Sequence, residues 1–261
     1  MRLIVLGCSG SGPGPVSPGS GYLVQVGDTH LTLDLGNGTF GALQRHLDPW
    51  SLDAVVFSHL HPDHCSDFPS LAVHRRYHPR PPYDATVRRL PVLAPMEAPA
   101  RFAAAYATSR AELAETDMTD VFVFHALSDG GSTKVGGATV RAGAVDHPCE
   151  AYALRVEHDG RSLVYSGDTG PCTGLVETAR GADVLLCEAT WPHVTDRWDE
   201  PPPGVHLSGR QAGEHAAAAD VGRLLITHVP AWFDAQELLA EAKEAFGGPV
   251  ELVEPDATYD I

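Results

Sequence analysis

Short apolar runs alternate along this chain with segments whose apolar residues recur every three to four positions. Runs rich in Val, Leu and Ile and bounded by Gly, Pro or Asp predict β-strands, whereas the three-to-four spacing predicts amphipathic helices. The predicted strands span residues 2–6, 21–26, 30–35, 53–58, 90–94, 121–125, 138–145, 151–157, 161–166, 183–187, 223–227 and 249–253. The predicted helices span residues 38–47, 67–77, 97–115, 173–180, 208–219 and 234–246.

The order of these elements predicts the fold class. The strands come in two batches and each batch ends in helices, so we expect an α/β protein in which helices cover two packed sheets, a four-layer αββα sandwich. Within the second batch, residues 151–168 predict a hairpin with Asp159-Gly160 at its turn. The Gly-, Pro- and Ser-rich residues 9–20 lie between two predicted strands, which favours an active-site loop over a linker.

Length and composition predict a single domain over residues 1–261, with 43% hydrophobic residues to fill its core. The apolar runs are far shorter than a membrane-spanning helix requires. The first residues, MRLIVLGCSG, lack the apolar region and cleavage site of a signal peptide. Five cysteines without a C-x-x-C pair agree with a reducing compartment. We therefore expect a cytoplasmic protein with no membrane segment.

The formal net charge of −16 limits the class of partner. Affinity for nucleic acid comes largely from Lys and Arg contacts to phosphates, so this charge argues against a structured nucleic acid. A small anionic ligand remains compatible with it, because a bound metal ion reverses the local field.

The stretch SHLHPDHCSD at 58–67 is the strongest chemical signal in the sequence. It places His59, His61, Asp63 and His64 within six positions, at the turn between a predicted strand and a predicted helix. Imidazole is the commonest metal ligand in proteins, and Asp supplies an oxygen ligand. Such a turn directs neighbouring side chains differently, so it can supply ligands to two metal ions. The alternative is a run of surface histidines before a helix.

Three further candidate ligands, His147, Asp168 and His228, each follow a predicted strand. Any one of them alone is explained as a solvated residue at a strand end. Their repeated placement favours convergence, because loops at one end of a sheet meet at one site.

The complete pattern resembles the metallo-β-lactamase superfamily: H-x-H-x-D-H, a distant His, an Asp in SGDT and a late His in THVP. The resemblance implies two divalent metal ions, Zn or Mn with Fe also possible, and a supporting role for Asp34 behind the ligand histidines. The alternative for Asp34 is a cap of its turn. It assigns His59, His61 and His147 to one metal ion, Asp63, His64 and His228 to the other, and Asp168 to both.

Three local features resemble the ribonuclease Z-like branch of that superfamily. They are the opening LGCSGSGPGPVSPGSGYLVQ, CEAT at 187–190 with Cys187 where that branch has His, and HLSG at 206–209. In that branch a Glu and a late His form a dyad beside the metals, which implies Glu188 and His206 here. With Asp63, which could also assist the attacking water, they are the predicted catalytic residues. Without the metal motif, Glu188 and His206 are explained as an acid at a strand end and a histidine at a helix start.

The substrate class follows from a missing segment. Ribonuclease Z carries an arm for transfer RNA between the residues that match His147 and Asp168, and only 21 positions separate them here. The chain thus resembles the bacterial cyclic-nucleotide phosphodiesterases, which implies hydrolysis of 3′,5′-cyclic AMP and GMP to 5′-nucleotides and a homodimer. The alternatives are an enzyme that acts on another small cyclic phosphodiester or on precursor transfer RNA, and a nucleotide sensor without turnover.

By position, loops 9–20 and 191–206 are candidates for contacting the base, whereas Cys65 and Cys149 match no ligand position.

Overall fold

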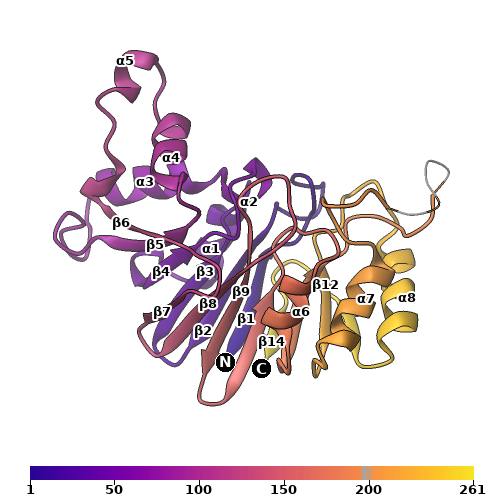
Figure 1. Cartoon of the computed structure of the whole chain (residues 1–261). Coiled ribbons are helices and arrows are strands. Elements are labelled where there is room, and N and C mark those ends of the chain that lie inside the picture. The colour runs from indigo at the N-terminus through magenta and orange to yellow at the C-terminus, as the bar shows by residue number, and fades with distance from the viewer. Residues whose placement is uncertain (196–198, 200) are drawn as a thin grey trace.

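A computed structural model describes residues 1–195, 199 and 201–261, which form two mixed β-sheets packed face to face with helices on both outer surfaces (Figure 1). This is the predicted αββα sandwich. In the described residues each sheet has seven strands. The first sheet runs, from edge to edge, β14 (Thr258–Asp260), β1 (Arg2–Gly7), β2 (Gly21–Val26), β3 (Thr29–Leu33), β4 (Ala54–Val56), β5 (Leu90–Ala94) and β6 (Phe122–Ala126). The second runs β13 (Val250–Leu252), β12 (Leu224–Thr227), β11 (Val184–Glu188), β10 (Arg161–Tyr165), β9 (Tyr152–His158), β8 (Ala138–Ala144) and β7 (Ser132–Val135).

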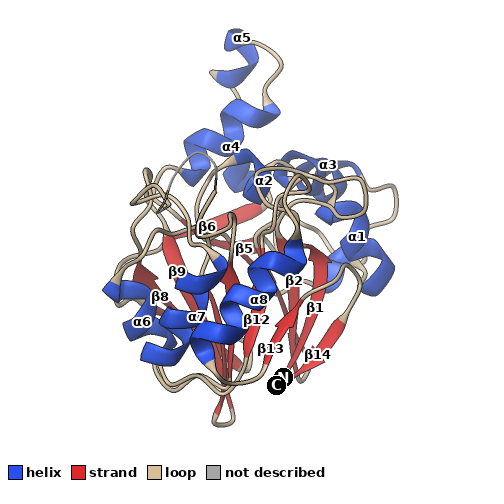
Figure 2. Cartoon of the chain, turned by 90° about the vertical axis from the view of Figure 1, so that its right-hand side faces the viewer, coloured by secondary structure: helices blue, strands red, loops and turns tan. Residues whose placement is uncertain are grey.

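The helices divide between the two outer faces (Figure 2). The first face carries α1 (Thr39–His46), α3 (Phe68–Tyr77), α4 (Ala98–Tyr106) and the short 3₁₀ turns η1 (Pro49–Ser51) and η2 (Met118–Asp120). The short helix α2 (Pro62–Cys65) lies at the edge of the sandwich, and α5 (Arg110–Leu113), which buries no residue, projects away from it (Figure 1). The second face carries α6 (Thr173–Ala179), α7 (Gly209–Ala218) and α8 (Ala235–Phe246). In the described residues no helix combines the length and the apolarity that crossing a bilayer requires.

Continuous apolar runs form these strands because both faces of each sheet are buried. In β1, Leu3 and Val5 point into the layer between the sheets, where they pack with residues of the second sheet such as Tyr165. Ile4 and Leu6 point the opposite way, into the layer beneath α1 and α3. A third apolar layer lies between the second sheet and α6, α7 and α8. Three apolar layers thus separate the four layers of backbone.

The predicted hairpin at 151–168 is confirmed. Strands β9 and β10 pair antiparallel, and Asp159 and Gly160 both take positive φ values, 47° and 75°. That geometry belongs to the two-residue turn whose twist matches the twist of its strands.

The predicted helix at 97–115 is wrong, because α4 ends at Tyr106 and a separate turn, α5, starts at Arg110. Ala107 is extended, and the Ser109 side chain caps α5 by accepting from the backbone N–H of Glu112. The alanine-rich pattern continues across this break, so periodicity alone missed it. Strands β7 and β14 at the sheet edges and helix α2 were also not predicted.

Strand direction brings distant residues to one edge of the sandwich. Strands β3, β4 and β5 are parallel neighbours, as are β10, β11 and β12. The carboxyl ends of parallel strands meet at the same edge. The loops that follow β4, β10 and β12 carry His59, Asp168 and His228, and therefore converge there. The two termini lie at the opposite edge (Figure 2).

Candidate metal centre

The H-x-H-x-D-H turn leaves β4 and enters α2. Ser58, His59 and Leu60 continue as irregular backbone, His61 is the extended residue before the helix, and Pro62 occupies its first turn. Proline suits that position because the first helical N–H groups have no partner within the helix. This change of backbone direction separates His59 and His61 from Asp63 and His64.

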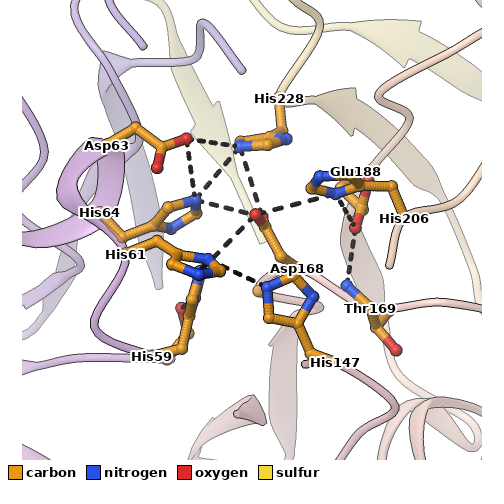
Figure 3. Close-up of polar contacts among 12 residues, drawn as sticks. His59, His61, Asp63, His64, His147, Asp168, Thr169, Glu188, His206 and His228 are labelled. Carbon is orange, nitrogen blue, oxygen red and sulfur yellow. Dashed lines mark hydrogen bonds and ion pairs between the residues drawn. The ribbon is translucent and has the colours of Figure 1, made fainter. Parts of the chain in front are cut away.

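The first cluster joins His59, His61, His147 and Asp168 (Figure 3). The Nδ1 atom of His61 lies 3.1 Å from the Nε2 atom of His59 and 3.1 Å from that of His147. The Nε2 atom of His59 lies 3.6 Å from Asp168 Oδ2. Three imidazole nitrogens and one carboxylate oxygen therefore surround one point.

The second cluster joins Asp63, His64, Asp168 and His228. The Nε2 atom of His64 lies 3.1 Å from that of His228 and 3.1 Å from Asp168 Oδ1. The Nε2 atom of His228 lies 3.2 Å from Asp63 Oδ2. Asp168 belongs to both clusters, one oxygen toward each, so the seven predicted ligands form two adjoining groups as the sequence suggested.

The nitrogens of these clusters fit metal ions better than they fit one another. His64 and His228 each give their Nδ1–H to an oxygen, at 2.7 and 2.8 Å, which leaves their two Nε2 atoms facing each other across 3.1 Å. Ligands about 2.0–2.1 Å from a tetrahedral zinc lie about 3.3 Å apart, close to these spacings. Asp168 Oδ1 is buried without a hydrogen-bond partner in the described chain. The donor set therefore fits a dinuclear metal site.

The electrostatics of the second cluster also favour positive charge, whereas in the first cluster burial and the neighbouring imidazoles lower the pKa of His59 well below its ordinary value. Burial alone lowers the pKa of His64, but the carboxylates of Asp168 and Asp34 raise this pKa well above its ordinary value. Burial alone raises the pKa of Asp168, but His228, His64 and His59 hold this pKa well below its ordinary value. Anionic oxygens and imidazoles buried together form a field that a cation neutralises.

Asp34 orients two ligand histidines of different clusters. Its Oδ2 accepts from His64 Nδ1–H at 2.7 Å, from the Ser58 hydroxyl at 2.7 Å and from the Tyr165 hydroxyl at 2.8 Å. Because the Ser58 hydroxyl donates to Asp34, its oxygen is left to accept from His59 Nδ1–H at 3.1 Å. Both histidines are thereby held with Nε2 toward the clusters, which agrees with the supporting role expected of Asp34.

Glu188 orients a ligand histidine of the second cluster, on the side of the site opposite Asp34. Its Oε2 accepts from the Thr190 hydroxyl at 2.6 Å, and the Thr190 oxygen accepts from His228 Nδ1–H at 2.8 Å. Its Oε1 accepts from the backbone N–H of Thr169 at 2.7 Å and from His206 Nδ1–H at 3.1 Å. The predicted Glu188–His206 pair is therefore present, and Glu188 also orients His228.

His206 lies beside the bridging carboxylate. Its Nδ1 is 3.8 Å from Asp168 Oδ2, and its side chain is 14% exposed. Burial alone lowers the pKa of His206, but the carboxylates of Glu188 and Asp168 raise this pKa to about 9. The ring is thus held as an imidazolium at neutral pH next to both clusters.

Besides the hydroxyls of Ser58 and Tyr165, three further supporting contacts were not anticipated from the sequence. They are the Thr190 hydroxyl, the Thr169 backbone, and the carbonyl of Val205, which accepts from His147 Nδ1–H at 2.9 Å. The sequence could have indicated Thr190, because residues two apart in an extended segment point to the same face and Thr190 follows Glu188 at that spacing. The other two contacts come from backbone groups, which no residue pattern marks.

The predicted loops are only partly placed at the site. Within loop 9–20, Ser20 N–H donates to the Asp63 carbonyl at 3.0 Å and Gly10 N–H to the Val229 carbonyl at 3.2 Å, so the loop lies against the second cluster. Loop 191–206 contributes Val205 and His206, but its residues 196–198 and 200 lie outside the described structure. Cys65 and Cys149 belong to neither cluster.

Comparison with known proteins identifies relatives over the whole chain. The family described as "Beta-lactamase superfamily domain" matches residues 31–229. An uncharacterized protein of Mycobacterium leprae is 48% identical over 263 residues, covering 100% of this chain and 89% of that protein. Ribonuclease Z of Mycolicibacterium paratuberculosis is 30% identical over 274 residues, covering 97% and 95%. The crystal structure of the metallo-β-lactamase fold protein YhfI from Bacillus subtilis superposes with a TM-score of 0.82 at 25% identity, covering 99% and 98%.

Proposed function

The chain belongs to the metallo-β-lactamase superfamily and is a metal-dependent hydrolase, and from this premise we propose that it is a phosphodiesterase that converts 3′,5′-cyclic AMP and cyclic GMP to 5′-nucleotides. The observation that carries the proposal is the Glu188–His206 pair beside Asp168. Hydrolysis of such a diester releases an alkoxide, a poor leaving group that needs a proton. An imidazolium adjoining a dinuclear centre supplies one.

His59, His61 and His147 would hold one metal ion, and Asp63, His64 and His228 the other, with Asp168 between them. When bound, two divalent ions supply Lewis acidity, which activates water and neutralises charge on the phosphoryl oxygens. The protein's own contribution is to hold these ligands rigidly, through Asp34 on one side and Glu188 on the other.

The proton transfer is assigned to His206. The attacking water gives up a proton to the Asp63 carboxylate or to solvent as its oxygen bonds to phosphorus, the bond from phosphorus to the 3′ oxygen breaks, and the departing oxygen takes a proton from the His206 imidazolium, which solvent then reprotonates. Glu188 accepts the Nδ1–H of that ring and keeps it charged before the transfer. A general acid of this kind contributes roughly 10²–10⁴-fold to the rate.

Two observations support a small substrate over transfer RNA. The residues between His147 and Asp168 form only the β9–β10 hairpin and its flanking turns, without an arm. The net charge of −16 opposes binding of a polyanion. The 30% identity to ribonuclease Z keeps precursor transfer RNA as the second candidate. Other small cyclic phosphodiesters, or nucleotide sensing without turnover, are the remaining candidates.

The test is release of 5′-AMP from 3′,5′-cyclic AMP by the purified protein loaded with Zn²⁺ or Mn²⁺. We expect turnover that is lost in Asp63→Ala. Absence of turnover on cyclic AMP and cyclic GMP, with metal bound, would overturn the proposal. Cleavage of precursor transfer RNA by the same preparation would then favour the second candidate, and tight nucleotide binding without hydrolysis would favour a sensor.

A further inference from the structure

A cavity of about 420 Å³ opens directly beside the first cluster. The partly exposed ligand His61 and its neighbour Leu60 form one wall, and Pro95, Glu97 and Arg101 form another at the start of α4. The loop between β8 and β9 closes a third side. The volume lies within the range of about 300–1,000 Å³ that is common for small-molecule sites. A ligand in this cavity would reach the first cluster at His61.

The charged side chains of the cavity differ in their partners. The Glu150 carboxylate accepts from the backbone N–H of Met96 at 3.1 Å and from the Tyr152 hydroxyl at 2.9 Å, so it holds the start of α4 in place. In the part of the chain that the structure describes, no hydrogen bond or ion pair joins the side chain of Arg101 or Glu97. These two exposed residues are four apart on one helix face, a spacing at which they could pair. They instead leave a donor and an acceptor facing the cavity.

We propose that this cavity receives the nucleobase of the substrate, with Arg101 as the residue that recognises it. The guanidinium donates to the ring nitrogen or carbonyl acceptors of a purine, a pairing that its geometry favours. Glu97 accepts from an exocyclic amino group, and Leu60 and Pro95 offer apolar surface to the ring. The inference rests on the proposed function, because it is the cyclic phosphodiester at the clusters that brings a base to this wall.

A larger cavity elsewhere is a poorer candidate. It measures about 1050 Å³ and lies beside α3 and α5, with no residue of either cluster in its lining. Its Arg76 is already paired with Asp120 at 2.8 Å. Its Arg75 is buried and donates to the carbonyls of Val121 and Arg88. Only the smaller cavity of the two touches a cluster residue.

The test compares two ligands that differ only in the base. Binding of 5′-AMP and of ribose 5-phosphate to the zinc-loaded protein is measured by titration calorimetry for wild type, Arg101→Ala, Arg101→Lys and Arg110→Ala. Arg110 is a matched control, an exposed arginine on α5 that does not line this cavity. We expect wild type to bind 5′-AMP about tenfold or more tightly than ribose 5-phosphate, the effect of one good hydrogen-bonded pair.

Arg101→Ala should abolish that difference without changing the affinity for ribose 5-phosphate, Arg101→Lys should restore part of it, and Arg110→Ala should keep all of it. The inference is wrong if wild type shows no preference for 5′-AMP, if Arg101→Ala retains the preference, or if this variant loses both ligands equally. Turnover of cyclic AMP is assayed separately. If the protein prefers 5′-AMP but does not turn over cyclic AMP, the proposed function is rejected and the base site is supported. If it turns over cyclic AMP but shows no preference for 5′-AMP, the base site is rejected and the proposed function is supported.

Discussion

At the scale of single residues, two hydroxyl groups decide which imidazole nitrogens face the metal centre. The hydroxyl of Ser58 donates to Asp34 and that of Thr190 donates to Glu188, so each oxygen can only accept from the histidine beside it. A carboxylate accepts only, and this fixes the direction of both chains of hydrogen bonds. His59 and His228 are thus held in the tautomer that presents Nε2.

Replacement of Thr190 tests this at the second cluster. Thr190→Val keeps the shape but removes the hydroxyl, so we expect the weaker-bound zinc ion to lose about 10- to 100-fold in affinity, as is common for supporting groups. Competition with a chromophoric chelator measures this without any substrate. Thr190→Ser is the control and should retain most of the affinity. Equal zinc affinity in Thr190→Val and wild type would contradict the orienting role.

Replacement of His206 tests the general acid. His206→Ala should lower kcat for cyclic AMP by roughly 10²–10⁴-fold, because the 3′ alkoxide then leaves unprotonated. Hydrolysis of bis(4-nitrophenyl) phosphate should change far less, since nitrophenolate leaves without a proton, and the zinc content should stay at the wild-type value. An equal loss on both substrates would instead indicate a disrupted metal centre.

At the scale of elements, the backbone conformation decides what each glycine contributes. Gly160 in the β9–β10 turn has a φ of 75°, whereas Gly41 lies within α1 at an ordinary negative φ. A Cβ atom at either position would meet nothing within 4 Å. Packing therefore cannot make an alanine at Gly41 differ in stability from an alanine at Gly160. Only backbone strain and the entropy of the unfolded chain distinguish the two positions.

The two glycines predict opposite effects of one substitution. Gly41→Ala should raise the free energy of unfolding by about 0.4–1 kcal/mol, because alanine restricts the unfolded chain and suits a helix. Gly160→Ala should lower it by about 1 kcal/mol or more, since a left-handed residue is strained by a Cβ atom. Urea denaturation measures both. The same sign for the two variants would refute the conformational argument.

A surface cluster at α1 predicts a pH dependence. His46 and Arg45 of α1 contact Asp256, at 2.6 and 2.8 Å, and lower the pKa of this carboxyl below its ordinary value. An acid with a lowered pKa in the folded state stabilises the fold above its unfolded pKa, and this contribution is lost as the pH falls through the folded pKa.

Asp256→Asn should therefore cost stability at neutral pH and cost progressively less below about pH 4. The cost should be small, about 0.2–1 kcal/mol, because the side chains of Arg45 and Asp256 are about half exposed. Urea denaturation as a function of pH gives the difference between variant and wild type. Asp28→Asn, at an exposed turn, is the control and should show no such trend. A cost that grows toward low pH would contradict the assignment.

At the scale of the whole molecule, the metal centre joins the two sheets. His59, His61, Asp63 and His64 follow a strand of the first sheet, and the remaining ligands follow strands of the second. A metal ion that binds only the folded state stabilises it by about 2.7 kcal/mol at a concentration 100 times its Kd. The fold and the site are therefore energetically coupled.

Removal of metal should lower the thermal stability. We expect Tm to fall by about 5–10 °C after dialysis against a chelator and to recover when Zn²⁺ is returned. Differential scanning calorimetry measures the shift. Asp168→Ala, which lacks the shared carboxylate, should respond to zinc much less. An identical Tm with and without zinc in the wild-type protein would show that the clusters do not hold the metal.

Much of the fold and the residues of both candidate metal clusters could be predicted from the sequence. Strands buried on both faces appear as apolar runs, and the H-x-H-x-D-H turn is contiguous, so short-range pattern marks both. His147, Asp168 and His228 were found because each directly follows such a run. Where short-range pattern misleads, as across the break at Ala107, the prediction failed.

Only the tertiary structure decided how the ligands are oriented and what surrounds them. The Val205 carbonyl that orients His147 is 58 positions away from it, and the cavity with Arg101 is assembled from three separate segments. Contacts of this kind depend on strand order and on the packing of the two sheets, and many involve backbone groups that every residue carries. The sequence by itself therefore determined the elements and the ligand types, and the packing of the sheets decided which lone pairs meet and where a substrate can lie.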